Sequence, residues 1–185
     1  MARVSVRPLE EGEFRLLGWL VMDTLEANPG WPDMALGRWS RVRPFTYMVA
    51  DAGDELVGVV FGYRQPDEGM VPNTHVDSPY IRGLDELEAA AAGTWFIAGL
   101  GASAKGRSYG AEPLLLTAAS DEATRTAARG LSTIVSLHLP SLSPLGRMQA
   151  FYETQGFTVR GERDGLYSLG APVRWLLMIR EHRPH

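Results

Sequence analysis

The stretch "GLGASAKGRSYG", residues 99 to 110, holds the residue types that proteins use to bind phosphate. Its glycines alternate with the basic residues Lys105 and Arg107, an apolar run precedes it and a leucine-rich run follows. A chain that leaves a strand through glycines and enters a helix offers backbone amides and the positive end of the helix dipole to an anion. We therefore expect a phosphate-bearing ligand at this stretch.

A dinucleotide is the first candidate for that ligand. Gly99, Gly101 and Ala104 satisfy the G-x-G-x-x-[GA] pattern of dinucleotide-binding folds. The helix of such a fold would begin near the second glycine, so Gly110 and Pro113 would fall inside that helix and interrupt it. The position of the helix therefore argues against a dinucleotide.

A P-loop and a pyrophosphate-binding loop are the other two candidates. A P-loop requires a lysine directly after a glycine at its end, and Arg107 stands there instead. In the third interpretation the amides of residues 106 to 110 wrap a pyrophosphate, and the helix begins at about Tyr109 or Gly110. Pro113 then lies in the first helical turn, where its missing N–H costs nothing. We favour this third interpretation.

Two motifs resemble those of the GNAT superfamily of acyl-CoA-dependent N-acetyltransferases. Lys105, Ser108 and Gly110 occupy the three defined positions of the family signature [QR]-x-x-G-x-[GA], with lysine and serine as substitutions. Downstream, "MQAFYETQGF" is similar to the family's a-x-x-l-Y-x-x-x-G-F pattern at the end of the helix after the fifth strand. The resemblance implies acetyl-CoA as cosubstrate and no metal.

The resemblance also implies where acetyl-CoA would bind. Its pyrophosphate would lie on the amides of residues 106 to 110, and its pantetheine arm would run along the strand end at Ala98 to Leu100. A backbone amide near Leu100 would polarise the thioester carbonyl. The residues implied in cofactor binding are Ala98, Leu100, Lys105, Gly106, Arg107, Ser108, Tyr109 and Gly110.

Tyr152 is the implied general acid. In the family the tyrosine at this position commonly protonates the departing CoA thiolate, and a phenol with a pKa of about 10 suits that role. The alternative is a core aromatic, because Leu145, Met148 and Phe151 share its helical spacing. Leu145 also stands where the family usually has an asparagine.

A general base is less clearly marked. His138, at the end of a predicted strand, could deprotonate an amine because its pKa lies near neutrality, or it could simply be packed. His75 has the same two interpretations. The stretch Thr94 to Leu100, where many family members place a base, contains no carboxylate.

The elements that position these residues can be read from periodicity and turn residues. We expect an α/β fold: a single GNAT-like domain over residues 1–185, with a mixed sheet of about six or seven strands, helices on both faces, and an inserted loop and short helix at about 66–93. The predicted elements are a strand ending at Pro8, a helix through Phe14 and Leu25, a hairpin of Phe45–Ala50 and Leu56–Tyr63, a strand Trp95–Leu100, a helix from about Gly110 to Gly130, a strand "STIVSLHL", a helix from Ser143 to Gly156, and the closing strands "FTVRGER" and "VRWLLMIR".

Composition narrows the class of protein. The chain has 185 residues, 45% of them hydrophobic, a formal charge of -4 and no cysteine. These values argue against nucleic acid as a partner and exclude disulfides and cysteine-ligated metals. No apolar run is long enough to span a membrane and no secretory signal is evident, so we expect a cytoplasmic protein.

Two functions remain open from the sequence. One is transfer of an acetyl group from acetyl-CoA to an amine of a small molecule or peptide by direct attack, in a monomer or a homodimer. The other is an acyl-CoA-binding sensor or interaction module without catalysis, which the substitutions at Lys105, Ser108 and Leu145 favour.

Overall fold

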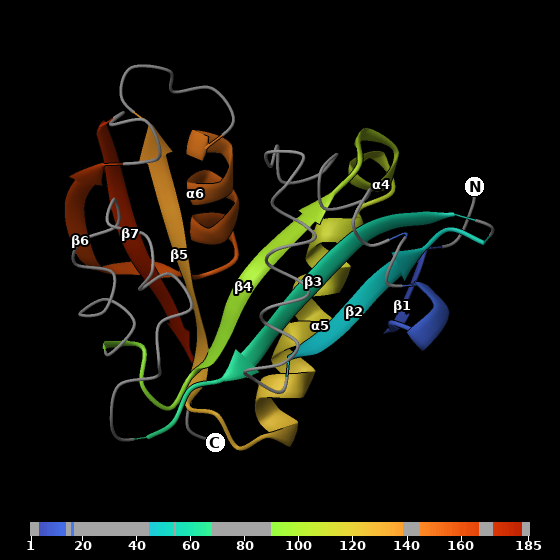
Figure 1. Ribbon diagram of the computed structural model, residues 1–185, viewed down its shortest axis with the longest axis horizontal. Helices are drawn as coiled ribbons and strands as arrows, with labels where there is room; N and C mark the ends of the chain where they lie inside the picture. The colour runs from blue at the N-terminus through green and yellow to red at the C-terminus, as the bar shows by residue number, and fades with distance from the viewer. Residues whose placement is uncertain are drawn as a thin grey trace. The chain divides into compact units, whose positions relative to one another are not determined.

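Seven strands form one mixed sheet in the order β1-β2-β3-β4-β5-β7-β6 (Figure 1). The computed structural model describes residues 4–13, 16, 45–53, 55–67, 90–138, 145–166 and 172–182. The predicted α/β class and the strand number are confirmed. The contacts divide the chain into two compact units, residues 1–63 with 97–122 and residues 64–96 with 123–185.

The first unit is built on a β-hairpin and a long helix. Its elements are β1 (Ser5–Pro8), the 3-10 helix η1 (Glu11–Glu13), β2 (Thr46–Asp51), β3 (Leu56–Arg64), most of β4 (Trp95–Ala102), α4 (Ala104–Ser108) and most of α5 (Ala111–Arg125). β1 pairs antiparallel with β2, and β2 with β3. The predicted hairpin is confirmed, and each of its strands extends one residue further at its C-terminal end.

The core of the first unit lies on the hairpin. Tyr47 and Val49 of β2 cluster with Val59 and Phe61 of β3, and all four side chains are buried. Tyr47 and Phe61 stack with their ring centroids 5.7 Å apart. These alternate positions share one face of the strands, as the two-residue period of a strand requires.

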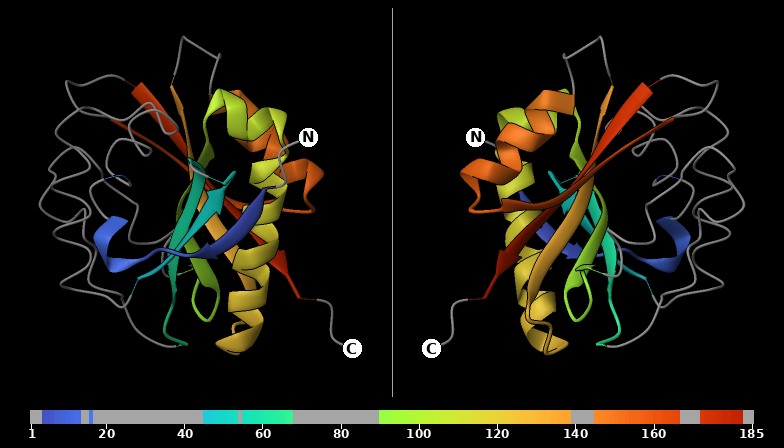
Figure 2. Two further views of the ribbon diagram at one scale, coloured as in Figure 1. Left: turned by 90° about the vertical axis from the view of Figure 1, so that its right-hand side faces the viewer. Right: turned by 90° about the vertical axis from the view of Figure 1, so that its left-hand side faces the viewer.

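Helix α5 packs against the hairpin strands (Figure 2). A Cβ on Gly58 of β3 would lie 2.9 Å from Leu115 Cδ1, so the glycine permits the close approach of helix and strand. Thr46 Oγ1 of β2 donates a hydrogen bond to Glu122 Oε1 of α5 at 3.1 Å. Leu115 shares its helix face with the buried residues Ala111 and Ala119, so small side chains line the face of α5 that lies on the hairpin.

The second unit holds β5 (Gly130–His138), α6 (Leu145–Thr154), β6 (Thr158–Leu166) and β7 (Pro172–Glu181). β7 pairs antiparallel with both β5 and β6. Trp175, Leu177 and Ile179 of β7 form a buried cluster with Ala91. The two closing antiparallel strands are confirmed.

The end of α5 differs from the prediction. The helix ends at Arg125, and Gly130 is the first residue of β5. Ala127 reverses the chain with a φ of 53°, the left-handed conformation that usually favours glycine. A glycine is the usual sign of a helix end, and here an alanine takes that place.

Several predicted features lie outside the described residues. They are the first helix through Phe14 and Leu25, most of the insertion at 66–93 including His75, and the helix start at Ser143. Among the described residues, no helix has the length and apolar character needed to cross a membrane.

Candidate functional site

The glycine-rich stretch begins inside a strand and not in a loop. β4 continues through Gly99 and Gly101 to Ala102, and α4 begins at Ala104. The glycines that fitted the dinucleotide pattern are therefore strand residues. The rejection of that pattern is consistent with this geometry, because no helix begins at Gly101.

Ser103 links β4 to α4. Its Oγ accepts a hydrogen bond from the Gly106 amide at 3.1 Å, which makes it the N-cap of α4. Its own amide donates to the Val57 carbonyl of β3 at 2.9 Å. The turn that follows β4 is thus fixed to β3 by its first residue.

The close approach of this turn to β3 requires a glycine at position 106. A Cβ at position 106 would lie 2.1 Å from the Val57 carbonyl oxygen, a distance that no side chain tolerates. Ser108, the substituted position of the family signature, is exposed, and its Oγ donates to the Lys105 carbonyl at 2.7 Å. The absence of a side chain therefore matters at 106 and not at 108.

The amides of the loop donate mainly to protein oxygens. Gly106 and Arg107 donate to the side chain and the carbonyl of Ser103, and Tyr109 and Gly110 donate to carbonyls of α4. The binding of a pyrophosphate by successive amides of residues 106 to 110 therefore stays a prediction. In this conformation those amides hold the turn together.

Helix α5 begins directly after the loop. Gly110 has a φ of 73°, which redirects the chain, and Ala111 is the first helical residue. Pro113 therefore lies in the first turn, as predicted, and the helix begins one or two residues later than expected. The amides of a first helical turn have no acceptor within the helix, so this N-terminus is suited to an anion.

The two loop cations both have partners. Lys105 Nζ donates to Glu55 Oε2 on the turn between β2 and β3 at 2.5 Å, and this hydrogen bond raises the pKa of Lys105. Arg107 Nη1 donates to the Ala102 carbonyl at the end of β4 at 2.5 Å. The position of Lys105 and Arg107 between a strand and a helix predicted that they bind phosphate. Their partners in the structure could not be read from the sequence.

The remaining predicted cofactor residues differ in exposure. Tyr109 is 36% exposed beside the start of α5. Leu100 is 2% exposed, and Ala98 packs against the hairpin core. Any contact of Ala98 or Leu100 with a ligand would therefore use the β4 backbone.

Tyr152 belongs to the second unit and is 3% exposed. Its ring centroid lies 5.0 Å from that of Phe157 and 5.4 Å from that of Phe151. The Phe157 amide donates to the Tyr152 carbonyl, and the Gly156 amide donates to that of Glu153. These bonds form a Schellman motif with Gly156 at a φ of 83°.

The "Y-x-x-x-G-F" pattern thus has a local structural cause. A Schellman motif places the residue after the left-handed glycine against the residue five positions earlier, which here brings Phe157 onto Tyr152. The predicted helix end at Gly156 is confirmed, with Thr154 as the last helical residue. Tyr152 therefore has a packing role, whatever its hydroxyl does.

His138 is the last residue of β5 and pairs with Val173 of β7. Its predicted place at a strand end is confirmed. Leu145 is the first residue of α6. Ser141 and Ser143, which could replace the missing asparagine, lie outside the described residues.

Sequence reasoning missed Glu55, Ser103 and the close approach at Gly106. Ser103 carried a usable signal, because a serine before a short run that enters a helix is a common N-cap. Glu55 carried none, since it lies 50 residues from Lys105 in the chain.

Comparison with known proteins places this fold. Neither a family model nor a curated protein matches the sequence. Among solved structures, a protein from Desulfovibrio desulfuricans assigned as an acetyltransferase of the GNAT family has a TM-score of 0.67 at 17% identity, over 96% of this chain and 98% of that one. The ribosomal-protein-S18-alanine N-acetyltransferase from Escherichia coli has a TM-score of 0.64 at 11% identity, over 98% and 96%.

A third structure carries a ligand. A GNAT family acetyltransferase from Elizabethkingia anophelis with acetyl-CoA bound has a TM-score of 0.61 at 12% identity, over 98% of this chain and all (100%) of that one. The similarity spans nearly the whole chain in each case, with no more than 17% of residues identical. The strand order and these matches together show that the chain has the fold of the GNAT acetyltransferases.

Proposed function

We propose that the protein transfers an acetyl group from acetyl-CoA to an amine. The observation that carries this proposal is the path of the chain from β4 through the docked turn at Ser103 into α5, in a fold shared with acetyltransferases. One of the proteins with this fold has acetyl-CoA bound. The proposed phosphate-binding groups are the first turn of α5 and the side chains of Lys105 and Arg107.

The chemistry of these groups fits the pyrophosphate of CoA. Two cations and a helix N-terminus supply positive charge and N–H donors, which is what a phosphate requires. Lys105 and Arg107 must exchange their present partners, Glu55 and the Ala102 carbonyl, for phosphate oxygens. Because the turn is fixed to Val57, this exchange moves side chains and leaves the backbone in place.

The proposed reaction is a direct attack. The amine nitrogen forms a bond to the thioester carbonyl carbon, the carbon–sulfur bond breaks, and the CoA thiolate takes up a proton. Tyr152 is the proposed proton donor, on the resemblance of "MQAFYETQGF" to the family pattern. His138 is a proposed base for the amine, and the amine itself belongs to a small molecule or a peptide.

Calorimetric titration with acetyl-CoA and CoA tests the binding step. A ligand that binds the native state also raises the melting temperature as its concentration exceeds Kd. We expect saturable binding and a rise in melting temperature. The absence of both at millimolar CoA would overturn the proposed function.

Release of CoA with a panel of amines tests the transfer step. The panel should contain small primary amines and a peptide that begins with alanine, the acceptor type named for the Escherichia coli protein of the same fold. We expect acceptor-dependent CoA release for at least one class. Mass spectrometry of the acceptor should show a single added acetyl group.

Tyr152→Phe separates the hydroxyl of Tyr152 from its packing role. The variant keeps the ring that packs on Phe157, so we expect an unchanged fold and CoA affinity. If the hydroxyl protonates the thiolate, kcat should fall by about 10²- to 10⁴-fold. Tyr63→Phe, which removes a hydroxyl from another buried tyrosine, is the matched control and should keep kcat. Equal rates in both variants would remove Tyr152 from the mechanism.

An acyl-CoA-binding sensor without catalysis is the second candidate. The observation that favours it is the loop, whose amides at 106, 107, 109 and 110 donate to protein oxygens and whose Lys105 is held by Glu55. Such a loop binds phosphate less strongly than one with open amides. Binding of acetyl-CoA without CoA release across the amine panel would favour this function.

A further inference from the structure

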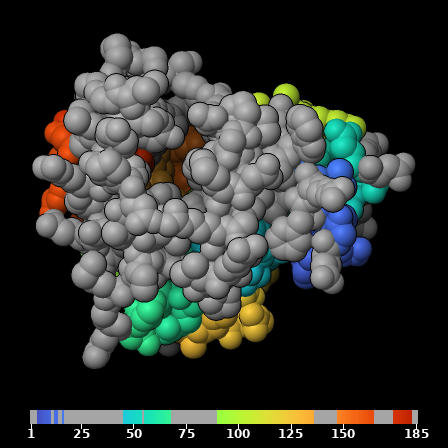
Figure 3. Space-filling view, viewed as in Figure 1, coloured from blue at the N-terminus to red at the C-terminus, as the bar shows by residue number. Residues whose placement is uncertain are grey.

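Glu55 lies on the turn between β2 and β3, beside the candidate phosphate-binding loop. Its carboxylate accepts the hydrogen bond from Lys105 Nζ, and the two side chains are 55% and 50% exposed. In Figure 3 the yellow-green segment of α4 lies against the teal segment of the β2–β3 turn at the surface. The ammonium group proposed to bind phosphate is thus already paired with an anion.

Two hydrogen bonds connect the described residues of the turn that carries Glu55. The Ala52 amide donates to the Glu55 carbonyl at 3.0 Å, and the Gly53 amide donates to Asp51 Oδ1 at 2.7 Å. Gly53 has a φ of 98°, which only a glycine adopts at low cost. The backbone of Glu55 is therefore tied to Ala52, and its side chain reaches Lys105.

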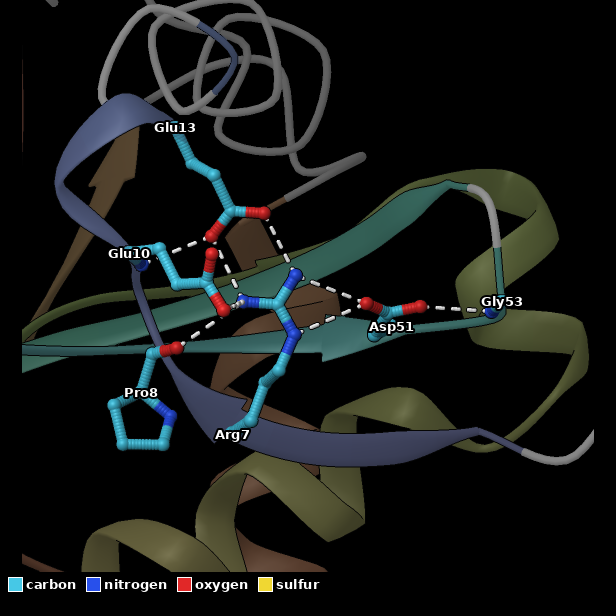
Figure 4. Close-up of polar contacts among 6 residues, drawn as sticks. All are labelled: Arg7, Pro8, Glu10, Glu13, Asp51 and Gly53. Carbon is cyan, nitrogen blue, oxygen red and sulfur yellow. Dashed lines mark hydrogen bonds and ion pairs between the residues drawn. The ribbon is translucent and has the colours of Figure 1, made fainter.

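Arg7 holds the base of the same turn (Figure 4). Its Nε and Nη2 donate to Asp51 Oδ2 at 3.1 and 3.0 Å, and its Nη1 and Nη2 donate to the carboxylate of Glu13 at 2.8 and 2.7 Å. Glu10 Oε1 lies 4.0 Å from Arg7 Nη1 as a third acidic partner, so Arg7 is surrounded by the carboxylates of Asp51, Glu13 and Glu10. Glu55, directly before β3, accepts its hydrogen bond from Lys105 instead.

The pairing of Lys105 has a consequence for anion binding. The Lys105 ammonium group has three N–H donors but a single positive charge. A phosphate that shares this group with Glu55 also meets the negative charge of the carboxylate, so full pairing with phosphate requires Glu55 to move away. Arg107 differs, because its partner in the structure is a neutral carbonyl. Phosphate binding at Lys105 therefore requires the Lys105–Glu55 contact to break, which lowers the affinity of the loop for phosphate.

We propose that Glu55 competes with the phosphate groups of acetyl-CoA for Lys105 and so sets the affinity of the loop for its ligand. The inference rests on the proposed function and adds a residue to it that no motif indicates. In the bound state Lys105 contacts phosphate and Glu55 faces solvent. Removal of the Glu55 charge should strengthen binding, and removal of the Lys105 charge should weaken it.

The expected effect is modest because the ion pair is exposed. Exposed pairs contribute little free energy, so we expect Glu55→Gln to lower Kd by about 1.5- to 5-fold. The effect should shrink as salt rises, since the screening length falls from about 10 Å at 0.1 M to about 3 Å at 1 M.

The experiment is calorimetric titration of the full chain with CoA and, separately, with inorganic pyrophosphate. The variants are Glu55→Gln, Lys105→Gln, the double variant and Asp121→Asn. Asp121 is exposed on α5, about 15 Å along the helix from Ala111, so its variant makes the same charge change away from the loop. Melting temperatures check that each variant is folded.

The proposal predicts that Glu55→Gln binds both ligands more tightly than the wild type. In the Lys105→Gln background the same change should leave the affinity unaltered. Asp121→Asn should have no comparable effect on affinity. Equal affinities for Glu55→Gln and Asp121→Asn would overturn it. So would an effect of Glu55→Gln that persists without Lys105, because repulsion at a distance would then be the cause. Failure of every variant to bind CoA would instead overturn the proposed function, and the competition with it.

Discussion

Gly106 is the position at which the loop after β4 allows no side chain. The family signature places its second defined residue at position 108, but the structure tolerates a side chain there and none at 106. The difference arises because α4 turns back onto β3 with Gly106 facing the Val57 carbonyl. A serine at position 108 is therefore compatible with the fold of the loop.

Gly106→Ala should destabilise the protein. The added Cβ would meet a backbone oxygen at 2.1 Å, so the turn must shift, which we expect to lower the free energy of unfolding by about 1–3 kcal/mol. Ser108→Ala, which changes an exposed side chain two residues away, is the control and should stay within about 0.5 kcal/mol. Urea denaturation measures both, and equal values would contradict the close approach.

At the scale of elements, α5 and α6 end in the same motif with different residues. In α5 the Ala128 amide donates to the Ala123 carbonyl and the Ala127 amide to that of Thr124. The bonds of Phe157 and Gly156 at the end of α6 have the same spacing. Position 127, however, holds an alanine in a left-handed conformation, which a Cβ makes unfavourable.

Ala127→Gly should therefore stabilise the protein. Relief of the left-handed strain outweighs the greater chain entropy of glycine in the unfolded state, and we expect a net gain of about 0.5–1 kcal/mol. The change in melting temperature and urea midpoint measures it. A loss of stability would show that Ala127 is not strained.

Gly156→Ala is the reverse exchange at the end of α6. The nearest atom to the new Cβ would be Arg180 Cδ at 3.7 Å, an ordinary contact, so the cost is conformational and not steric. We expect a loss of about 1 kcal/mol in the free energy of unfolding. A neutral result in the same urea assay would contradict the φ of 83°.

At the scale of the whole molecule, acid should weaken the anchoring of the first strand. Hydrogen bonds from Arg7 lower the pKa of Glu13 from 4.5 to about 2. Because the folded pKa is lower than the unfolded one, Glu13 stabilises the protein above about pH 5, and that stabilisation is lost as the pH falls toward 2. The wild-type protein should therefore lose stability more steeply over this range than Glu13→Gln, as urea midpoints at successive pH values would show. Parallel curves would contradict the contribution of Glu13.

Much of this fold could be predicted from the sequence because its signals are local. Two apolar runs around the turn sequence "DAGDE" marked the hairpin, and Gly156 marked the end of α6. The end of α5 could not be predicted, since an alanine occupies the glycine position at 127. The site was only partly predictable. The cations Lys105 and Arg107 lie two positions apart in the sequence, but the Glu55 partner of Lys105 and the Val57 contact of Gly106 depend on strands brought together by folding.

The two ends of the strand order, β1 and β6, determine how the sheet meets other chains. β1 has only four residues and ends in Pro8, which has no N–H to donate to a neighbour. β6 is irregular between Val159 and Gly161, and the charged residues Arg160, Glu162 and Arg163 are exposed along it. Short, charged and irregular edges resist pairing with a further strand. In the part of the chain that the structure describes, both edges therefore disfavour continuation of the sheet from one copy to the next, which opposes edge-to-edge aggregation.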